Sequence, residues 1–390
     1  MPLFALARLL TSLLSWVFLA VAVYLLATWY RGDEVITAAG DILKVRDDWR
    51  LWTGLGLVAW SFLGRLPVTT LFARRDTEPT RPVREDGAVV VSPTGSSLYV
   101  ERRGPSGPSI ILTHGWGLDS TIWHDFKRDA ASRQASYPHR LITWDLPGLG
   151  RSKAAAGGVD LDRFAEDLAF LVERETGPVV LVGHSIGGMT IQTLVRRRPD
   201  LFDSRIAGVV LVNTTYTNPL KTMILSKVAR ALRRPVLEPL FHLAIWLQPL
   251  AWLGAWQSYL SGSAHLANLI GFGRPPTRSQ LEHVTLLATR NPPGVLAKGN
   301  LAMSDWDATG AMAAVRCPVL ILGGLRDIVT KVEASETIAA ATPDARLDRV
   351  EGANHLGFLE RADHYNAAIL DFAAEVTASQ IPAAASRRSV

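Results

Sequence analysis

The 390-residue sequence contains a single cysteine, Cys317, and no basic stripe with interleaved aromatic residues. One cysteine cannot form a disulfide within the chain, which is compatible with a reducing compartment. Because Cys317 begins the apolar segment CPVLIL, we expect it to be a small buried side chain. The 41 Lys and Arg residues only slightly outnumber the 36 Asp and Glu residues and are scattered, so nothing indicates nucleic-acid binding.

Residues 3–30 form a long apolar run in which Arg8 is the only charged residue. The run is long enough to cross a bilayer as a helix, and Trp29 and Tyr30 suit the membrane interface. A cleaved signal peptide is the alternative. The start has little positive charge, the run is too long for such a peptide, and no small-residue cleavage site follows it. We therefore expect a retained membrane segment.

A second apolar stretch, residues 51–72, is interrupted by Arg65 and Pro67. It either crosses the membrane, with Arg65 reaching the interface, or forms a re-entrant or surface-lying helix. We expect a membrane-anchor region over residues 1–75, with about two apolar helices joined by a charged loop at 31–50. Arginines 65, 74, 75, 81 and 84 lie within or after the second stretch, against four basic residues in the loop. This balance predicts that the remaining chain lies on the cytoplasmic side of the membrane, the inner membrane in a bacterium.

Residues 76–87, with Pro79 and Pro82 among charged residues, are typical of a linker. From residue 88, short apolar runs alternate with helical patterns, which predicts an α/β fold with a mostly parallel sheet covered on both faces. The expected strands are 88–92, 98–102, 109–113, 140–145, 179–182, 207–213, 317–323 and 345–350. The expected helices are 121–134, 160–175, 189–198, 331–341 and 362–375.

The alternation breaks at residues 216–305, which hold apolar helical patches and no convincing strand. We expect an inserted helical cap there, between two parts of a core at 88–215 and 306–376. Its tryptophans 246, 252 and 256 are core residues, the lining of an acyl-chain pocket, or a membrane-facing patch. Residues 377–390, rich in Ala, Ser and Arg, are expected to be a disordered tail.

The segment PVVLVGHSIGG, residues 178–188, places G-x-S-x-G between an expected strand and an expected helix. In such a turn, side chains at Gly183 and Gly187 would collide with neighbouring backbone, and Ser185 is held in strained geometry with an exposed Oγ. The motif alone arises by chance in roughly one in ten chains of this length, so a plain glycine-rich turn is the alternative.

An acid and a histidine follow Ser185, each just after a later strand. Asp327 lies in GGLRD and His355 lies in EGANH. Because the carboxyl ends of parallel strands meet at one edge of the sheet, these side chains are expected to converge there. His355 would take the proton of Ser185, and Asp327 would hold the imidazole. Asp305 and Asp307 are rival acids, but only Asp327 directly follows a clear strand.

Two backbone N–H groups, of Trp116 and Ile186, are expected to form an oxyanion hole. Gly115 and Gly117 would allow the loop that carries Trp116 to approach closely. Trp116, Leu118 and Leu356 are candidates for a substrate pocket.

The remaining polar candidates are expected to be structural. His184 is expected to pack beside the nucleophile, His114 to order the oxyanion loop, and Asp145 to fix the turn at residues 146–150. Histidines 242, 265 and 283 have no companions at metal-ligand spacing, so we expect packing or surface roles for them and no metal site.

Five motifs in register make residues 88–376 resemble the α/β-hydrolase superfamily: HGWG at 114–117, DLPGLGRS at 145–152, GHSIGG at 183–188, Asp327 after its strand, and GANH at 352–355. The resemblance is to capped "fold-1" serine esterases and lipases. It implies the α/β-hydrolase fold with an inserted helical cap. Epoxide hydrolases and haloalkane dehalogenases have Asp as the nucleophile, where this chain has Ser185. The resemblance does not cover the N-terminal region.

These features together predict a membrane-anchored serine hydrolase that cleaves carboxylic esters through an acyl-enzyme, with no cofactor and no metal. An apolar cap beside a membrane anchor favours a hydrophobic, lipid-like ester or acyl substrate. A thioesterase, an amidase, a C–C bond hydrolase or a perhydrolase would use the same triad. A catalytically silent, membrane-tethered binding module is the alternative from another class.

Overall fold

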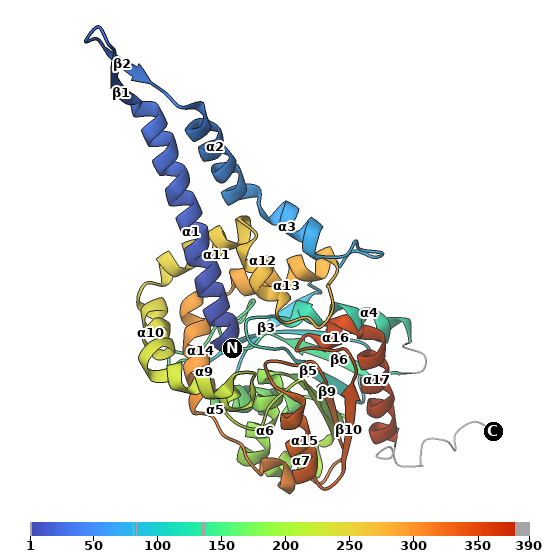
Figure 1. Ribbon diagram of the computed structural model, residues 1–390. Helices are drawn as coiled ribbons and strands as arrows, with labels where there is room; N and C mark the ends of the chain where they lie inside the picture. The colour runs from blue at the N-terminus through green and yellow to red at the C-terminus, as the bar shows by residue number, and fades with distance from the viewer. Residues whose placement is uncertain (1, 81, 83, 134–136, 379–390) are drawn as a thin grey trace, which may run out of the picture.

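An eight-stranded sheet lies at the centre of the fold in the computed structural model, which describes residues 2–80, 82, 84–133 and 137–378 (Figure 1). The strand order is β10-β9-β8-β7-β5-β6-β4-β3. Strands β5 to β10 pair in parallel, whereas β3 and β4 pair antiparallel at one edge, so the predicted mostly parallel sheet is confirmed. The strands are β3 (Gly87–Val91), β4 (Ser97–Arg103), β5 (Ser109–Thr113), β6 (Arg140–Trp144), β7 (Val179–His184), β8 (Ile206–Val212), β9 (Val319–Gly324) and β10 (Ala345–Val350).

Helices cover both faces of this sheet (Figure 1). Helices α5 (Leu161–Glu173), α6 (Ile186–Arg197) and α15 (Val332–Ala341) pack on one face, and α4 (His124–Ser132) and α17 (Ala362–Ala378) on the other. Strands β5, β7 and β8 are buried along their whole length, which explains their nearly unbroken apolar sequence. The expected helix at 121–134 is split into a short 3-10 turn, Ser120–Trp123, and α4; residue 134 lies outside the described residues.

Between β8 and β9 the described chain forms helices and no strand, as the apolar patches predict. The division of the chain into domains stays a prediction. The expected disordered tail, residues 377–390, is wrong at its start, since residues 377 and 378 are the last turn of α17 and Thr377 is buried. The rest of it, from residue 379, lies outside the described residues. The helices between β8 and β9 are α8 (Pro219–Thr222), α9 (Ser226–Leu232), a π-helical turn (Arg233–Leu237), α10 (Glu238–Trp246), α11 (Gln248–Leu260), α12 (Ser263–Leu269), α13 (Arg278–Arg290), α14 (Pro293–Asp305) and a 3-10 turn (Ala311–Ala314).

The N-terminal region forms a helical hairpin that projects from the α/β domain (Figure 1). Helix α1 (Pro2–Arg31) leads outward and α2 (Asp48–Leu63) returns beside it, followed by α3 (Arg65–Phe72). The expected charged loop at 31–50 is wrong in one respect. It contains an antiparallel β-hairpin of β1 (Asp33–Ile36) and β2 (Ile42–Val45), because β-branched residues on both sides flank a turn in which Gly40 has a φ of 87°.

One helix is long and apolar enough to cross a membrane, over Leu9–Arg31. Two bent pairs pass the same test of length and composition: α2 with α3, bent by 68°, and Ser226–Trp246 with Gln248–Leu260, bent by 102°. The described chain therefore offers one candidate span, or up to three if each bent pair counts as one.

Candidate active site

Ser185 lies in the sharp turn between β7 and α6, with a φ of 55° and a ψ of −116°. This backbone conformation is strained for a residue with a Cβ. A Cβ on Gly183 would lie 2.4 Å from the carbonyl carbon of Gly187, and one on Gly187 would lie 2.4 Å from the carbonyl oxygen of Thr113. Both flanking positions therefore require glycine if this turn is to form.

The fold brings Ser185, Asp327 and His355 together at the carboxyl edge of the sheet. His355 Nε2 lies 3.2 Å from Ser185 Oγ, and His355 Nδ1 lies 3.0 Å from Asp327 Oδ2. All three residues are buried. The rival acids bond elsewhere: Asp305 pairs with Arg233, and Asp307 accepts hydrogen bonds from Thr217 and Lys221.

Donors surround the carboxylate of Asp327. Its Oδ1 accepts the backbone N–H groups of Val329 and Thr330, each at 2.8 Å. Its Oδ2 accepts the hydroxyl of Thr330 at 2.8 Å and the amide of Asn213 at 3.0 Å, besides His355. Burial alone would raise the pKa of Asp327, but the charge of His355 and these hydrogen bonds outweigh it, so the pKa is lowered. Asp327 is therefore held as a carboxylate.

Sequence reasoning missed Asn213 and Thr330. Asn213 directly follows strand β8, has a positive φ of 44° and also accepts a hydrogen bond from Tyr365 at 3.0 Å. The available signals were an asparagine at a strand end, a residue type that tolerates positive φ, and a threonine three residues after the acid.

Two buried histidines support the loop that follows β5. The ring of His114 bridges the carbonyl of Gly115 at 2.8 Å and the N–H of Leu146 at 3.0 Å. His184 Nε2 lies 3.0 Å from the carbonyl oxygen of His355. The His184 ring also packs closely against the loop, so that a Cβ on Gly115 would lie 2.5 Å from His184 Nδ1. Burial lowers the pKa of both imidazoles, which stay neutral and structural.

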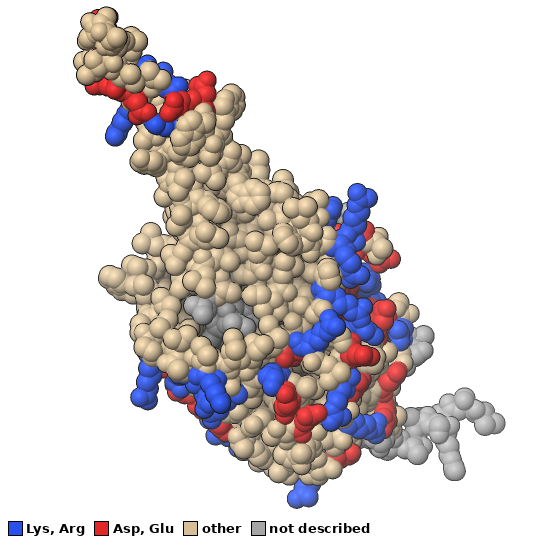
Figure 2. All heavy atoms as spheres, in the orientation of Figure 1, with Lys and Arg blue, Asp and Glu red and all other residues tan. Residues whose placement is uncertain are grey.

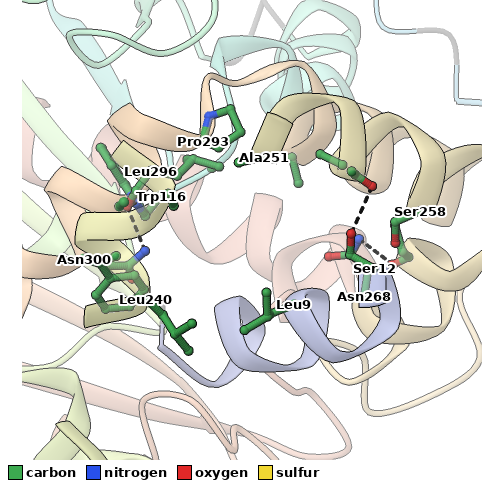
Figure 3. Close-up of a pocket in the computed structure, with 18 of the residues that line it drawn as sticks. Leu9, Ser12, Trp116, Leu240, Ala251, Ser258, Asn268, Pro293, Leu296 and Asn300 are labelled. Carbon is green, nitrogen blue, oxygen red and sulfur yellow. Dashed lines mark hydrogen bonds between the residues drawn. The ribbon is translucent and has the colours of Figure 1, made fainter. Parts of the chain in front are cut away.

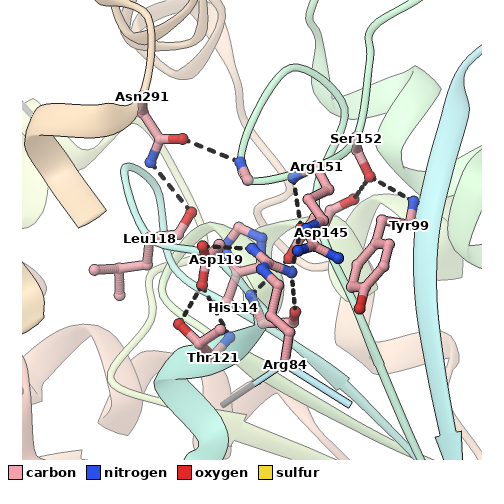
Figure 4. A network of polar contacts seen from close by, with 12 residues as sticks. Arg84, Tyr99, His114, Leu118, Asp119, Thr121, Asp145, Arg151, Ser152 and Asn291 are labelled. Atoms are coloured by element: carbon pink, nitrogen blue, oxygen red, sulfur yellow. Dashed lines mark hydrogen bonds and ion pairs between the residues drawn. The ribbon is translucent and has the colours of Figure 1, made fainter. Parts of the chain in front are cut away.

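Arg84, from the predicted linker, holds the same loop from below (Figure 4). Its guanidinium contacts Asp119 at 2.6 Å and Asp145 at 2.9 Å. Asp145 in turn accepts the N–H groups of Ser120 and Arg151, each at 2.7 Å. Asp145 therefore ties the loop after β5 to the turn after β6, and Arg84 neutralises the two buried carboxylates at this junction.

Of the two expected oxyanion donors, Ile186 directly follows Ser185 in the chain, and Trp116 lines the same cavity as Ser185. Ile186 is the first residue of α6, so its N–H has no acceptor within the helix. Trp116 lies on the loop after β5, and Gly117 beside it has a φ of 81°. The indole of Trp116 donates to the carbonyl of Leu296 on α14 at 3.1 Å, which fixes the loop against the cap.

A cavity of about 440 Å³ lies above these residues and includes Ser185 and His355 in its lining. Trp116, Leu118 and Leu356, the predicted pocket residues, line it as well. Apolar side chains of α10, α11 and α14 form a large part of the remaining wall. Figure 3 shows that α1 closes one side, with Leu9 and Ser12 facing the cavity. Sequence reasoning missed this contribution. Among the described residues, no group of three His, Cys, Asp or Glu side chains could hold a metal ion.

Comparison with known proteins agrees with this architecture. A pimeloyl-[acyl-carrier protein] methyl ester esterase of Chromobacterium violaceum is 28% identical over 279 residues, covering 70% of this chain and 97% of that protein. The esterase EaEST from Exiguobacterium antarcticum superposes with a TM-score of 0.60 at 18% identity, covering 74% of this chain and 99% of that one.

A bromoperoxidase from Bacillus anthracis superposes with a TM-score of 0.58 at 21% identity, again covering 74% of this chain and 99% of that one. Structural similarity at these low sequence identities shows only that the fold is shared. The family model described as "Alpha/beta hydrolase family" matches residues 110–368, about two thirds of the sequence. On that match, the chain belongs to the alpha/beta hydrolase family.

Proposed function

We propose that this protein is a membrane-anchored serine hydrolase that cleaves carboxylic esters through an acyl-enzyme. The observation that carries the proposal is the relay from Asp327 through His355 to Ser185, with hydrogen-bond distances of 3.0 and 3.2 Å. A serine hydroxyl is a weak nucleophile at its own pKa and needs such a base.

In the proposed reaction, Ser185 Oγ attacks the ester carbonyl carbon while His355 Nε2 accepts the hydroxyl proton. Asp327 fixes Nδ1–H of the imidazole and stabilises the imidazolium. His355 then gives the proton to the leaving alcohol. In the second half, it takes a proton from water, which attacks the acyl-enzyme and releases the acid.

The N–H groups of Trp116 and Ile186 would stabilise the negative charge on the oxygen of each tetrahedral intermediate. Loss of one such donor typically lowers kcat by about 10²- to 10³-fold. The ties of the Trp116 loop to His114, His184 and α14 keep its N–H in place without reorganisation during the reaction.

Ester cleavage, rather than another reaction of the same triad, is supported by the similarity to the Chromobacterium violaceum methyl ester esterase. The apolar wall of the cavity favours a substrate with a hydrophobic acyl group, such as an acylglycerol or another lipid ester. Activity confined to short, water-soluble esters would contradict this part of the proposal.

Membrane anchoring is supported by α1, whose residues Leu9–Arg31 are long and apolar enough to cross a bilayer. Exposed basic residues on the catalytic side, including Arg74, Arg75 and Arg230, favour a cytoplasmic location for the α/β domain. Protease treatment of inverted vesicles tests this: we expect the C-terminus to be digested, and protection would contradict the orientation.

Labelling of the detergent-purified protein with a fluorophosphonate tests the nucleophile. We expect Ser185→Ala to abolish labelling and ester hydrolysis. Ser258→Ala, which alters another serine in the cavity wall, should retain both. Labelling that survives in Ser185→Ala, or wild-type protein that neither labels nor hydrolyses any ester in a panel of chain lengths, would contradict the proposal. The second result would favour a silent binding module.

A further inference from the structure

The first half of α1 is part of the cavity wall. Leu9, Ser12, Leu13 and Trp16 line the cavity opposite α11 (Figure 3). Ser12 Oγ donates to the carbonyl oxygen of Gly254 at 3.1 Å. A Cβ on Gly254 would lie 3.0 Å from Ser12 Oγ. Close approach of two helices at a small residue, with serine hydrogen bonds across the contact, is typical of packing inside membranes.

The length of α1 places this contact at membrane depth. The 23 residues of Leu9–Arg31 extend about 35 Å as a helix, against a hydrocarbon core of about 30 Å. A span therefore needs nearly all of them, including Ser12, Ser15 and Trp16. Ser15 donates to Ser261 at 2.8 Å, at the end of α11. Because α1 and α11 are in direct contact, α11 lies beside the membrane-embedded part of α1.

The outer face of α10 and α11 is apolar and exposed. Trp246 is 79% exposed, Leu250 62% and Leu253 55%, and no charged residue lies between Leu240 and Leu260. Both helices belong to the bent pair, Ser226–Trp246 with Gln248–Leu260, that passes the test of length and composition for a membrane span. An apolar surface that continues from a spanning helix marks a membrane contact.

Charged residues border this surface. Lys227, Arg230 and Arg234, just before α10, are exposed. Figure 2 shows the uncharged surface running from the projecting hairpin onto the body of the molecule, with Lys and Arg side chains at its margins. Basic residues at that level suit lipid headgroups.

Some residues both line the cavity and are exposed on this surface. Leu13 and Trp16 of α1 are 54% and 38% exposed, and Leu243 and Leu250 of α10 and α11 are 46% and 62% exposed. Side chains with these two properties border the opening of the cavity. The opening therefore lies between α1 and α10–α11, on the apolar surface.

We propose that the cavity opens into the hydrocarbon of the bilayer and that the substrate is a lipid ester that enters sideways between α1 and α10–α11. Helix α1 is then a wall of the acyl-chain site as well as an anchor. The chemistry at Ser185 rests on the function proposed above, but the route of entry is tested separately.

The depth of the apolar surface is tested with a polarity-sensitive fluorophore at Leu250→Cys, in a Cys317→Ala background, in phosphatidylcholine–phosphatidylglycerol vesicles. We expect quenching by lipids with nitroxides on the acyl chain and little quenching by aqueous iodide. The control Val91→Cys, on the edge strand β3 and 68% exposed, should show the reverse. Quenching of residue 250 by iodide, or protection from both quenchers by a second copy of the chain, would overturn the proposal.

The route of entry is tested with Leu253→Asp and Trp246→Asp, which change the outer surface and not the cavity lining. A charge at membrane depth should lower hydrolysis of a long-chain ester in vesicles on the order of tenfold or more. Hydrolysis of a short soluble ester in detergent should not change, and Val91→Asp should affect neither. Unchanged vesicle activity in both surface variants would overturn lateral entry, whereas a wild type inactive on every ester would overturn the proposed function.

The role of α1 as a wall of the cavity is tested by substituting two neighbouring residues of this helix. Leu9 lines the cavity, while Leu10 faces outward and is 58% exposed. Leu9→Trp should exclude several methylene groups and lower the ratio of long-chain to short-chain kcat/KM on the order of tenfold or more. Leu10→Trp should leave the ratio unchanged. An unchanged ratio in Leu9→Trp would refute the role of α1 as a wall.

Discussion

Replacement of Asp327 by asparagine tests the relay most directly, because the surroundings dictate how the new amide must lie. Oδ1 faces two backbone N–H groups, of Val329 and Thr330, that cannot turn into acceptors. The asparagine oxygen must therefore stay at this position, and its NH₂ group takes the place of Oδ2. That NH₂ group would then face His355 Nδ1, 3.0 Å away in the native protein.

A donor at this position reverses the tautomer of His355. Nδ1 must accept a hydrogen bond, so the proton moves to Nε2, which can no longer take the proton of Ser185. In serine proteases a change of this kind lowers kcat about 10⁴-fold, which corresponds to about 5.4 kcal/mol of transition-state stabilisation. We expect a loss of the same order in Asp327→Asn, together with a lower unfolding temperature, because the new NH₂ group also faces the amide donor of Asn213, which lies 3.0 Å from Oδ2 in the native protein.

The assay is kcat and kcat/KM for a short soluble ester in detergent, together with the rate of fluorophosphonate labelling. Asp305→Asn and Asp307→Asn are the controls and should keep nearly full activity, since these carboxylates bond to Arg233 and Lys221. An Asp327→Asn enzyme within about tenfold of wild type, or a larger loss in either control, would refute the assignment of the acid.

Three further predictions follow from the packing around the site. Gly115→Ala would place a Cβ 2.5 Å from His184 Nδ1. This clash should displace the Trp116 N–H and lower kcat about 10²-fold. The control Gly56→Ala, whose added Cβ meets no other part of the chain within 4 Å, should leave kcat unchanged. Arg84→Lys cannot bridge two carboxylates that each take a different guanidinium nitrogen, so we expect a loss of about 3 kcal/mol, seen as a lower apparent unfolding temperature; a variant as stable as wild type would contradict the bridge. Burial and the charge of His124 lower the pKa of His283 from 6.5 to about 4. Between pH 6.5 and pH 4, His283 therefore binds a proton in the unfolded chain but not in the folded protein. The free energy of unfolding should fall by about 2 kcal/mol as the pH drops from 7 to 5. His283→Gln should flatten this dependence of the unfolding temperature on pH, and an unchanged slope would contradict it.

The sheet and the convergence of the site residues could be predicted because both depend on local signals. Strands β5, β7 and β8 are apolar runs bounded by turns, and parallel strands bring their carboxyl ends to one edge whatever the length of the chain between them. Ser185, Asp327 and His355 each follow such a strand closely. The roles of Asn213 and Arg84 could not be predicted in this way, because each depends on contacts between segments far apart in the sequence, which no local pattern encodes.

The tryptophans of the cap show a different limit. Composition left three alternatives open for them, and the structure assigns each one an environment of its own. Trp246 is largely exposed, Trp252 donates to the carbonyl of Thr289 at 2.9 Å, and Trp256 packs edge-on against Tyr259. Helical periodicity could not separate these cases, because α10 and α11 are apolar on nearly all sides.

Hydropathy alone does not reveal the contact between the N-terminal helix α1 and α11. A count of apolar residues treats α1 as uniform, but Ser12 and Ser15 lie three residues apart and share one face of the helix. Their partners on and after α11, Gly254 and Ser261, are also small. Small and hydroxyl side chains on one face of an apolar helix indicate a partner helix, because lipid gives them nothing to bond. That signal was in the sequence, but it could name the partner only after the cap had been placed above Ser185. Through this contact α1 forms part of the cavity wall. Under the proposed membrane anchoring, the depth of the protein in the bilayer is therefore coupled to the shape of the site.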